Sequence, residues 1–281
     1  MRRNKLREMM KEDKPTIGVR VLSGWPGIVE VIGHTGAIDY VEFLGTYAPW
    51  DLYDLENFAR AVELFDMSSM MKIDENCRAF LAQRAVGSGI QNVLFTNIRT
   101  AEDARECVRI VKPETPEIGG LHGCLGSRNV GYVMEGGSPE YVKAINDSVI
   151  AMMIEKKEAV DNLEEILSVK GIDMVQFGPT DYSLTIGLPG QVSHSETKEA
   201  ELITIKTALK RGVRVRVEIG DIHGSNIENI QKYLDLGVRD FSLPSDVFIL
   251  YQCLKENGEN LRKILSEIYG TSQDTWEQRV Q

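Results

Sequence analysis

The sequence has few of the residues that build a zinc ribbon or a disulfide framework. It contains 4 cysteines and 4 histidines among 281 residues, and the cysteines lie far apart without a CxxC pair. We therefore expect reduced thiols. The N-terminus lacks the apolar segment of a signal peptide, and no apolar run approaches the ~20 residues that span a bilayer. We expect a cytoplasmic protein without a membrane partner.

Blocks of basic residues are also missing. Lys and Arg number 32 against 42 Asp and Glu, which gives a formal net charge of −10, and they occur singly apart from a short run at residues 2–7. Because phosphate binding needs a concentrated basic face, we expect no nucleic-acid partner. A hydrophobic fraction of 42% with 26% charged residues is ordinary for a globular protein with a full core.

Short β-rich apolar runs alternate with stretches of helical periodicity along most of the chain. Buried parallel strands read as continuous apolar runs, because both of their faces are covered. Eight candidate strands follow from this pattern, at residues 16–21, 39–44, 69–73, 92–95, 149–154, 174–177, 213–217 and 240–243. Thr100, with Asp103 three residues later, resembles a capping box before one of the helices.

Eight strands that alternate with helices fit either a closed barrel or an open, doubly wound sheet. The dinucleotide-binding GxGxxG fingerprint and the phosphate-binding GxxxxGK[ST] loop are both absent. Strand count and chain length favour the barrel. We predict an α/β fold, a single-domain (β/α)8 TIM barrel over residues 1–270, followed by a polar tail at 271–281.

One segment interrupts the alternation. Residues 113–148 form a long link that is rich in proline and glycine. A connection of this length in a compact domain is usually functional or part of an interface.

Acidic residues follow two neighbouring predicted strands. Glu155 comes directly after the fifth strand, and Asp181 follows the sixth. Active sites of such barrels form at the carboxyl ends of the strands, and adjacent strands lie about 4.8 Å apart. Both side chains could therefore hold one hard cation such as Mg²⁺, although each could instead cap a helix.

The residues around these two acids resemble the HpcH/HpaI aldolases, which are metal-dependent pyruvate aldolases. Residues 153–159 read MIEKKEA and are similar to the family's QIETREA, with matching leucines and isoleucines through residue 167. Residues 171–187 are similar to its GVD..FIGPADLS..MG motif. Weaker similarities occur at Gly45 with Ala48-Pro49 and at residues 233–243, so that the resemblance covers roughly residues 4–265.

The resemblance implies a metal site and a substrate class. Glu155 and Asp181 would hold Mg²⁺ (or Mn²⁺ or Co²⁺), which a small-molecule 2-oxo acid chelates. The ion would stabilise the enolate that forms when a carbon–carbon bond breaks. Backbone amides of Gly178, Thr180 and Asp181 would bind the substrate carboxylate, whereas Pro179 has no amide hydrogen. The resemblance also implies a homo-oligomer.

The sequence departs from the family in the catalytic half of the motif. Tyr47 stands where the family has its histidine base, and Thr46 replaces the glutamate before it. Leu44 replaces the acid that orients the histidine. Lys72 stands where the family has an arginine, which keeps the charge but loses the bidentate fork. A Schiff-base role for Lys72 is an alternative, and Met153 replaces a polar glutamine near the ion.

Other residues could take part in proton transfer. Tyr47 could donate a hydrogen bond or act as an acid, or it could be a packing residue. His122, His223 and Asp51 are alternative bases, and Arg128 falls where the family has an arginine near the substrate mouth. We include Lys72, Tyr47 and Arg128 in the predicted catalytic group.

Three functional hypotheses follow. The first is a metal-dependent carbon–carbon lyase with altered proton transfer. The second is an oxo-acid decarboxylase or hydrolase at the same ion, because decarboxylation also yields an enolate but needs no base to begin. The third is a barrel that retains the metal site without catalysis, since a fold alone does not determine function.

Overall fold

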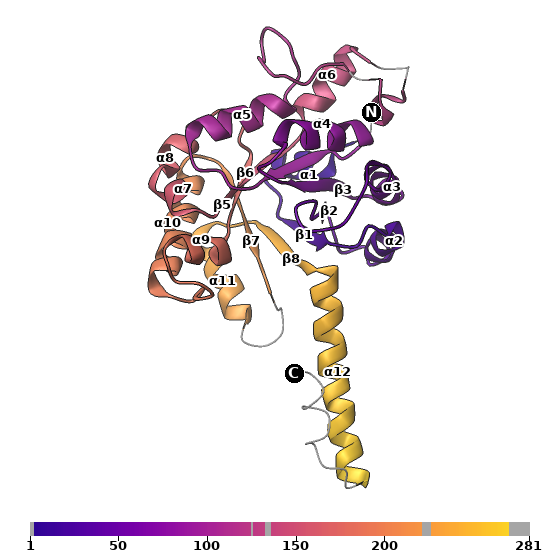
Figure 1. Cartoon of the computed structure of the whole chain (residues 1–281), viewed down its shortest axis with the longest axis vertical. Coiled ribbons are helices and arrows are strands. Elements are labelled where there is room, and N and C mark those ends of the chain that lie inside the picture. The colour runs from indigo at the N-terminus through magenta and orange to yellow at the C-terminus, as the bar shows by residue number, and fades with distance from the viewer. Residues whose placement is uncertain (1–2, 125, 133–135, 221–225, 270–281) are drawn as a thin grey trace.

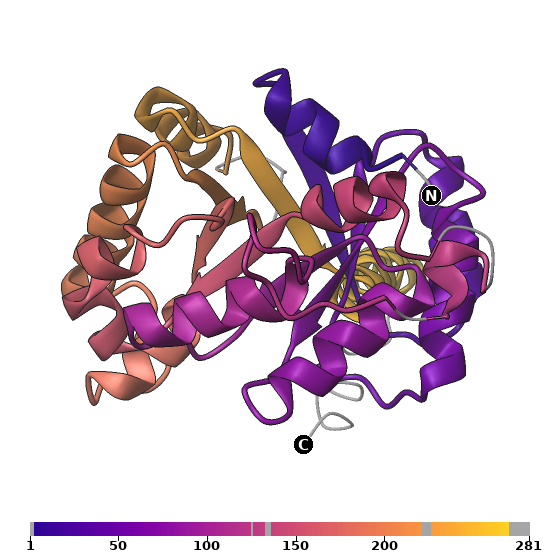
Figure 2. The same cartoon turned by 90° about the horizontal axis from the view of Figure 1, so that it is seen from above.

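The chain folds into a closed barrel of eight parallel strands, as the sequence predicts (Figures 1 and 2). The computed structural model describes residues 3–124, 126–132, 136–220 and 226–269, and the side chains of residues 226–228 are outside this description. Each strand begins and ends within two residues of its predicted range. The strands are β1 (Thr16–Val21), β2 (Tyr40–Phe43), β3 (Ser68–Ile73), β4 (Asn92–Phe95), β5 (Ile150–Ile154), β6 (Met174–Phe177), β7 (Arg214–Glu218) and β8 (Asp240–Ser245).

Helices surround most of the barrel. The predicted capping box of Thr100 with Asp103 is present and begins α5. Among the described residues, no helix is both long and apolar enough to cross a membrane. The helices are α1 (Lys5–Lys11), α2 (Pro26–His34), α3 (Leu52–Val62), α4 (Arg78–Ser88), α5 (Ala101–Val111), η1 (Arg128–Val130), α6 (Pro139–Asn146), α7 (Lys157–Asp161), α8 (Leu163–Ile166), α9 (Pro179–Thr185), α10 (Ser195–Lys210), α11 (Asn226–Leu236) and α12 (Asp246–Tyr269).

The N-terminal end of the barrel is closed by α1. Leu6 is fully buried and packs with apolar side chains from inside the barrel, among them Tyr40 and Met70. Arg7 donates two hydrogen bonds of 2.6 Å to the carboxylate of Asp173. A second, larger core lies between the strands and the surrounding helices. The opposite, carboxyl end of the barrel is thus the end that can admit a substrate.

The long link after α5 contains more regular structure than its composition suggests. Ser138 caps α6 by accepting a hydrogen bond from the N–H of Tyr141, and Pro139 occupies the first turn. Val130 of η1 and Tyr141 pack with Val86 of α4. The predicted link therefore includes a helix that starts with the expected cap and proline.

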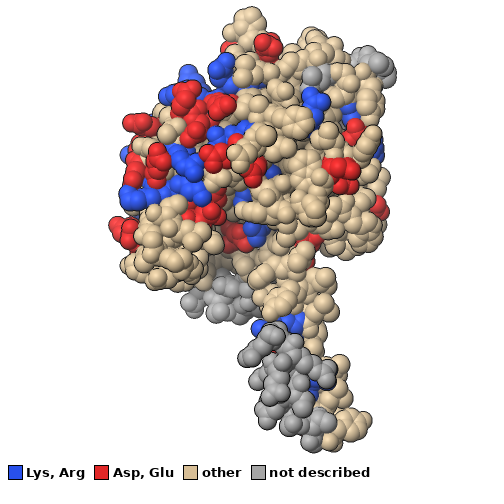
Figure 3. Space-filling view, viewed as in Figure 1, with Lys and Arg blue, Asp and Glu red and all other residues tan. Residues whose placement is uncertain are grey.

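Helix α12 differs from the other helices because it leaves the barrel at the end of β8 and extends away from it (Figure 1). None of its side chains is buried. In Figure 3, charged side chains of both signs gather on the side of the barrel that carries α7, α8 and α10, whereas the visible part of α12 is mainly uncharged. Ile17 of β1 is 41% exposed, although every residue of β2 to β6 is buried. The predicted tail 271–281 lies outside the described residues.

Candidate active site at the mouth of the barrel

The two acids predicted to hold a metal lie at the carboxyl ends of β5 and β6. Glu155 is 3% exposed, and its Oε1 accepts a hydrogen bond of 2.8 Å from the backbone N–H of Asn97. Burial raises the pKa of Glu155, against the lowering effects of Lys72 and the Asn97 N–H, and the negative charge of Asp181 raises it further. The two carboxylates therefore interact electrostatically, and Glu155 is held in a site that opposes its charged form.

Asp181 lies in the first turn of α9 and is more open than Glu155. Its side chain is 41% exposed, and Oδ1 accepts a hydrogen bond of 2.9 Å from Nζ of Lys156. Lys156 also lowers the pKa of Glu155. One ammonium group thus partly offsets the repulsion between the two carboxylates.

Gly178 makes room for Glu155. A Cβ atom on Gly178 would lie 2.7 Å from Cβ and 3.0 Å from Oε2 of Glu155, and the first distance is too short for any side chain. The amide of Gly178 donates to the carbonyl of Ile154 at 3.0 Å, so it is not free to bind a carboxylate as we predicted. Thr180 and Asp181 lie in the first turn of α9, where N–H groups have no acceptor within the helix.

Lys72 and Tyr47 form a hydrogen-bonded pair at the same mouth. Lys72 is buried on β3, and its Nζ donates to the hydroxyl oxygen of Tyr47 at 3.0 Å while lying 4.8 Å from the ring centroid. Tyr47 follows β2 and is 60% exposed. Lys72 has the largest lowering effect on the pKa of Glu155. The structure therefore brings Lys72, Tyr47 and Glu155 into one group.

The donor set at β5 and β6 suits a hard cation. No cluster of three or more His, Cys, Asp or Glu side chains arranged to hold a metal occurs in the described part of the chain. Two carboxylates are nevertheless the usual protein contribution to a Mg²⁺ site, because water and substrate oxygens complete the octahedron. Glu155 and Asp181 fit this pattern.

Comparison with known proteins decides the family. The HpcH/HpaI aldolase/citrate lyase family matches residues 30–251. The chain belongs to this family. The hydroxypyruvate/pyruvate aldolase of Paraburkholderia phytofirmans is 24% identical over 264 residues, which cover 92% of this chain and 98% of that protein. The 2-keto-3-deoxy-L-rhamnonate aldolase of Escherichia coli (strain K12) is 29% identical over 210 residues, 74% of each chain.

Solved structures agree with the barrel fold. An HpcH/HpaI aldolase/citrate lyase family protein from Burkholderia cenocepacia J2315 has a TM-score of 0.83 and 24% identity, over 92% of this chain and 100% of that one. This likeness shows the fold alone. Family membership and the two aldolase relatives support a carbon–carbon lyase of the aldolase type that acts on small molecules.

Arg128 does not join the mouth in this family member. Its guanidinium makes two hydrogen bonds to the carboxylate of Glu63, at 2.8 and 2.5 Å, and a third to the carbonyl of Ser88 at 3.2 Å. Gly89, at the end of α4, leaves the space that Arg128 fills, because a Cβ there would lie 2.3 Å from Nη1. The catalytic role predicted for Arg128 therefore does not fit its position, which is set by the path of the link across α4.

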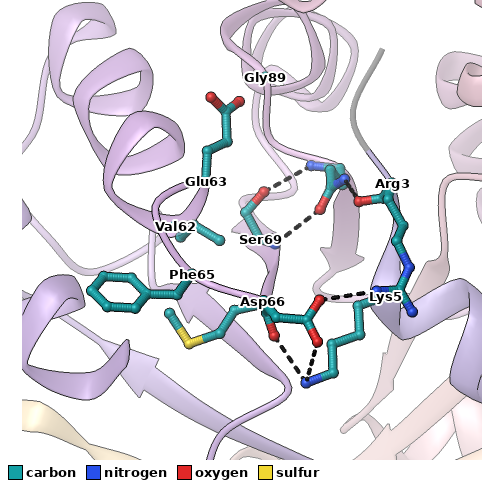
Figure 4. A pocket seen from close by; sticks show the side chains of 10 residues that line it. Arg3, Lys5, Val62, Glu63, Phe65, Asp66, Ser69 and Gly89 are labelled. Atoms are coloured by element: carbon teal, nitrogen blue, oxygen red, sulfur yellow. Dashed lines mark hydrogen bonds and ion pairs between the residues drawn. The ribbon is translucent and has the colours of Figure 1, made fainter. Parts of the chain in front are cut away.

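Glu63 and Gly89 also line a pocket at the N-terminal ends of β3 and β4 (Figure 4). The pocket has a volume of about 190 Å³. Its charged groups satisfy one another, since Asp66 pairs with both Arg3 and Lys5. This pocket is at the end of the barrel opposite to Glu155 and Tyr47.

The alternative bases are also placed elsewhere. His122 is buried beside the end of α5, and burial, together with the charge of Arg84, lowers its pKa to about 4. Asp51 caps α3 in a capping box with Asp54. His223 lies outside the described residues. Lys72 pairs instead with Tyr47, and Asp51 accepts hydrogen bonds from the N–H groups of Tyr53 and Asp54.

The sequence analysis did not predict two charged pairs, one inside the barrel and one at its mouth. Arg216 of β7 pairs with Glu42 of β2, and Arg20 of β1 pairs with Glu218, the last residue of β7. Arg216 also donates to Oε1 of Gln176 at 2.6 Å. The signal was available in the period-two alternation of β7, RVRVE, which places charged residues on one face of a buried strand.

Proposed function

We propose that this protein is a divalent-metal-dependent carbon–carbon lyase that cleaves a 2-oxo acid to a pyruvate enolate and an aldehyde. The grouping of charged and polar side chains around Glu155 supports the proposal. Glu155 is a buried carboxylate whose pKa is raised, it lies beside Asp181, and the Lys72–Tyr47 pair belongs to the same mouth. Because a carboxylate is costly to bury alone, a cation at this position would offset its charge.

Each residue has a distinct task in this proposal. Glu155 and Asp181 hold Mg²⁺, or Mn²⁺ or Co²⁺ in its place. When bound, the ion supplies Lewis-acid stabilisation of negative charge on the oxygens of the 2-oxo acid. Lys72 adds a second positive charge close to Glu155, and the amides of Thr180 and Asp181 orient the substrate carboxylate.

Tyr47 takes the position of the proton-transfer group. In cleavage, the substrate hydroxyl loses its proton and its carbon becomes an aldehyde carbonyl, while the electrons of the broken carbon–carbon bond pass to the enolate. The Tyr47 hydroxyl oxygen accepts a hydrogen bond from the Lys72 ammonium, which fixes the position of the hydroxyl for proton transfer. A proton then adds to the enolate carbon to give the methyl group of pyruvate.

A second candidate function is decarboxylation of an oxo acid at the same residues. It is favoured by the presence of Tyr47 rather than a histidine beside Lys72, because loss of CO₂ leaves an enolate without prior removal of a proton. A barrel that binds the ion without turnover is the remaining hypothesis.

Proton exchange of pyruvate separates these possibilities. With Mg²⁺, we expect the methyl protons of pyruvate to exchange with deuterium from solvent, observed by NMR, and Asp181→Ala to abolish the exchange. Absence of both exchange and metal affinity would refute the lyase. Oxaloacetate turnover that is unaffected by Tyr47→Phe would instead identify the decarboxylase, and binding of oxo acids without any turnover would identify the non-catalytic barrel.

We also infer a homo-oligomer in which copies of this chain exchange α12. Apolar side chains follow one another along α12 at spacings of three, four and seven residues, and all are exposed within the chain; they are Val247, Tyr251, Leu254, Leu261, Leu265 and Ile268. This is the stripe of a helix that packs on a partner surface. The outer face of β1 and β8 is the complementary surface, because it carries the exposed Ile17 and the partly exposed Phe241.

Among the described cysteines, none is in a disulfide, and Cys77, Cys124 and Cys253 are exposed. Exposed thiols are compatible with a reducing compartment, which supports the cytoplasm. We propose a small 2-oxo acid as the ligand, and neither nucleic acid nor membrane as a partner.

A further inference from the structure

A second group of charged side chains extends from the interior of the barrel to its mouth, beside the predicted metal site. Arg20 comes from β1, Glu42 from β2, and Arg216 and Glu218 from β7. In the closed strand order, β1 is four strands from β5 and β2 is four strands from β6. Arg20 and Glu42 therefore lie across the barrel from Glu155 and the start of α9, whereas Arg216 and Glu218 lie on the strand next to β6. We call these four residues the β1–β7 group.

The β1–β7 group is unusual for a barrel interior. Such interiors are generally filled by layers of branched apolar side chains. Arg216 and Glu42 are each 1% exposed and form an ion pair with each other. A buried ion pair seldom adds stability over apolar residues of the same size. This charge therefore indicates a function at the site.

Several polar atoms of this region have no hydrogen-bond partner among the described residues. They include Nη2 of Arg216, Nε of Arg20, Oε1 of Glu42 and the hydroxyl of Thr46. The other carboxylate oxygen of Glu42, Oε2, pairs with Arg216. A buried polar group without a partner is costly, and such groups often await a ligand or water. Hydrogen-bond donors and acceptors without a partner among the described residues thus occur together, near the mouth of the barrel.

The backbone also departs from regular pairing at this place. The register between β1 and β8 shifts between Val19 and Arg20. Bulges are common at barrel rims and beside active sites, where they redirect a side chain. Here the shift precedes Arg20, which pairs with Glu218 across β8.

The charges of the β1–β7 group identify the kind of ligand. Two guanidinium groups and two carboxylates sum to no net charge. An anionic ligand would have to displace Glu218 from Arg20, and an apolar ligand would leave the open donors and acceptors unpaired. A hydroxyl group both donates and accepts, so it can pair with an arginine and a glutamate at once.

We propose that Arg20 and Glu218 form a specificity subsite that binds the hydroxylated, uncharged end of the substrate, with the Arg216–Glu42 pair as its floor. This inference rests on the proposed function, because it assigns the aldehyde half of the same reaction. The 2-oxo acid half lies at β5 and β6, and the rest of the carbon chain extends past β7 toward the Arg20–Glu218 pair. Arg20 and Glu218 are therefore the residues that distinguish one aldehyde from another.

The test is aldol addition of pyruvate to three aldehydes of similar size in the presence of Mg²⁺. In this direction, the methyl carbon of pyruvate loses a proton and bonds to the aldehyde carbon, whose oxygen takes up a proton. The aldehydes are glyceraldehyde, which is hydroxylated, propanal, which is apolar, and succinic semialdehyde, which is anionic. We expect the unaltered protein to have its highest kcat/KM with glyceraldehyde.

Two variants test the roles of the pair. The double variant Arg20→Leu with Glu218→Leu should lower the ratio of kcat/KM for glyceraldehyde over propanal by at least tenfold, chiefly through KM for glyceraldehyde. Glu218→Gln should raise kcat/KM for succinic semialdehyde, because it frees the charge of Arg20. The matched control is Arg211→Leu with Glu164→Leu, an exposed ion pair on the outer helices, which should not change either ratio.

The outcomes separate this inference from the proposed function. Unchanged aldehyde ratios in both variants, with melting temperatures that show folded protein, would overturn the subsite. A preference of the unaltered protein for succinic semialdehyde or propanal would also overturn it, as would pyruvate proton exchange without addition to any aldehyde. Failure of the unaltered protein to exchange pyruvate protons would remove the proposed function itself, and this inference with it.

Discussion

Nζ of Lys72 lies 3.0 Å from the hydroxyl oxygen of Tyr47 and donates a hydrogen bond to it. This pair stands where relatives are expected to have an arginine and a histidine. If Tyr47 transfers the proton, Tyr47→Phe should lower kcat for aldol cleavage by about 100-fold, with a smaller effect on KM. Steady-state kinetics with coupled detection of pyruvate would measure this. Tyr53→Phe, an exposed tyrosine on α3, is the control.

The pH dependence of stability should report the buried carboxylate. Burial raises the pKa of Glu155 in the folded protein, so the folded state binds this proton more tightly than the unfolded state does. The cost of the charged form is absent below the unfolded pKa and grows as pH rises through the folded value. Without metal, Glu155→Gln should therefore melt at a higher temperature than the unaltered protein near pH 8, and the difference should vanish near pH 4.

Metal binding should reverse the order of the melting temperatures of the unaltered protein and Glu155→Gln. Mn²⁺ should raise the melting temperature of the unaltered protein but not that of Glu155→Gln, and its affinity should increase as pH rises through the Glu155 pKa. Equal melting curves for the two proteins at every pH, with and without Mn²⁺, would contradict a charged metal ligand at this position.

Gly178→Ala should weaken metal binding without unfolding the protein. The added Cβ would lie 2.7 Å from Cβ of Glu155, so the glutamate side chain must move. Calorimetric titration should show a loss of Mn²⁺ affinity of at least about tenfold, within the range seen when groups around metal ligands are altered. Gly220→Ala, where a Cβ meets no atom within 4 Å, should leave the affinity unchanged. Equal affinity in both variants would show that Glu155 is not a ligand.

The sequence was most informative where one physical rule governs a whole element. Parallel strands covered on both faces need apolar residues throughout, so β4 and β6 could be placed to the residue. Glu155 and Asp181 lie at the ends of β5 and β6, where the sequence placed them, and their role as metal ligands stays a prediction. Arg216 does not follow the rule for buried parallel strands. A charged residue within a strand suggests an exposed face, but Arg216 pairs with Glu42 inside the barrel.

The path of long connections was not predictable in the same way. Arg128 occupies a glycine-rich link, and nothing local to its sequence specifies that it meets Glu63 at the end of α3. Likewise, the amphipathic pattern of α12 predicts a helix with an apolar face. It does not indicate that this face stays exposed within the chain.

Arg128→Ala separates the catalytic prediction for this residue from its observed structural role. The guanidinium is largely buried and bonded to both oxygens of Glu63, so its removal should lower the free energy of unfolding by about 2 kcal/mol. Urea denaturation would measure this. Arg60→Ala, which removes an exposed ion pair with Glu56, should cost less than about 1 kcal/mol. A large fall in kcat with unchanged stability would instead return Arg128 to the active site.

If copies of the chain exchange α12, charged residues placed on the apolar stripe of this helix should dissociate the oligomer. Leu261→Asp with Leu265→Asp places two carboxylates where α12 would contact a partner barrel, and both positions are exposed within one chain. The monomer should therefore still fold, but light scattering after gel filtration should show dissociation of the oligomer. Lys255→Ala with Glu259→Ala, an ion pair on the other side of α12, should leave the assembly intact. An unaltered protein that is monomeric at micromolar concentration, or a charged variant that keeps the same mass, would rule out α12 as the contact, because burying two uncompensated carboxylates in an apolar interface costs several kcal/mol.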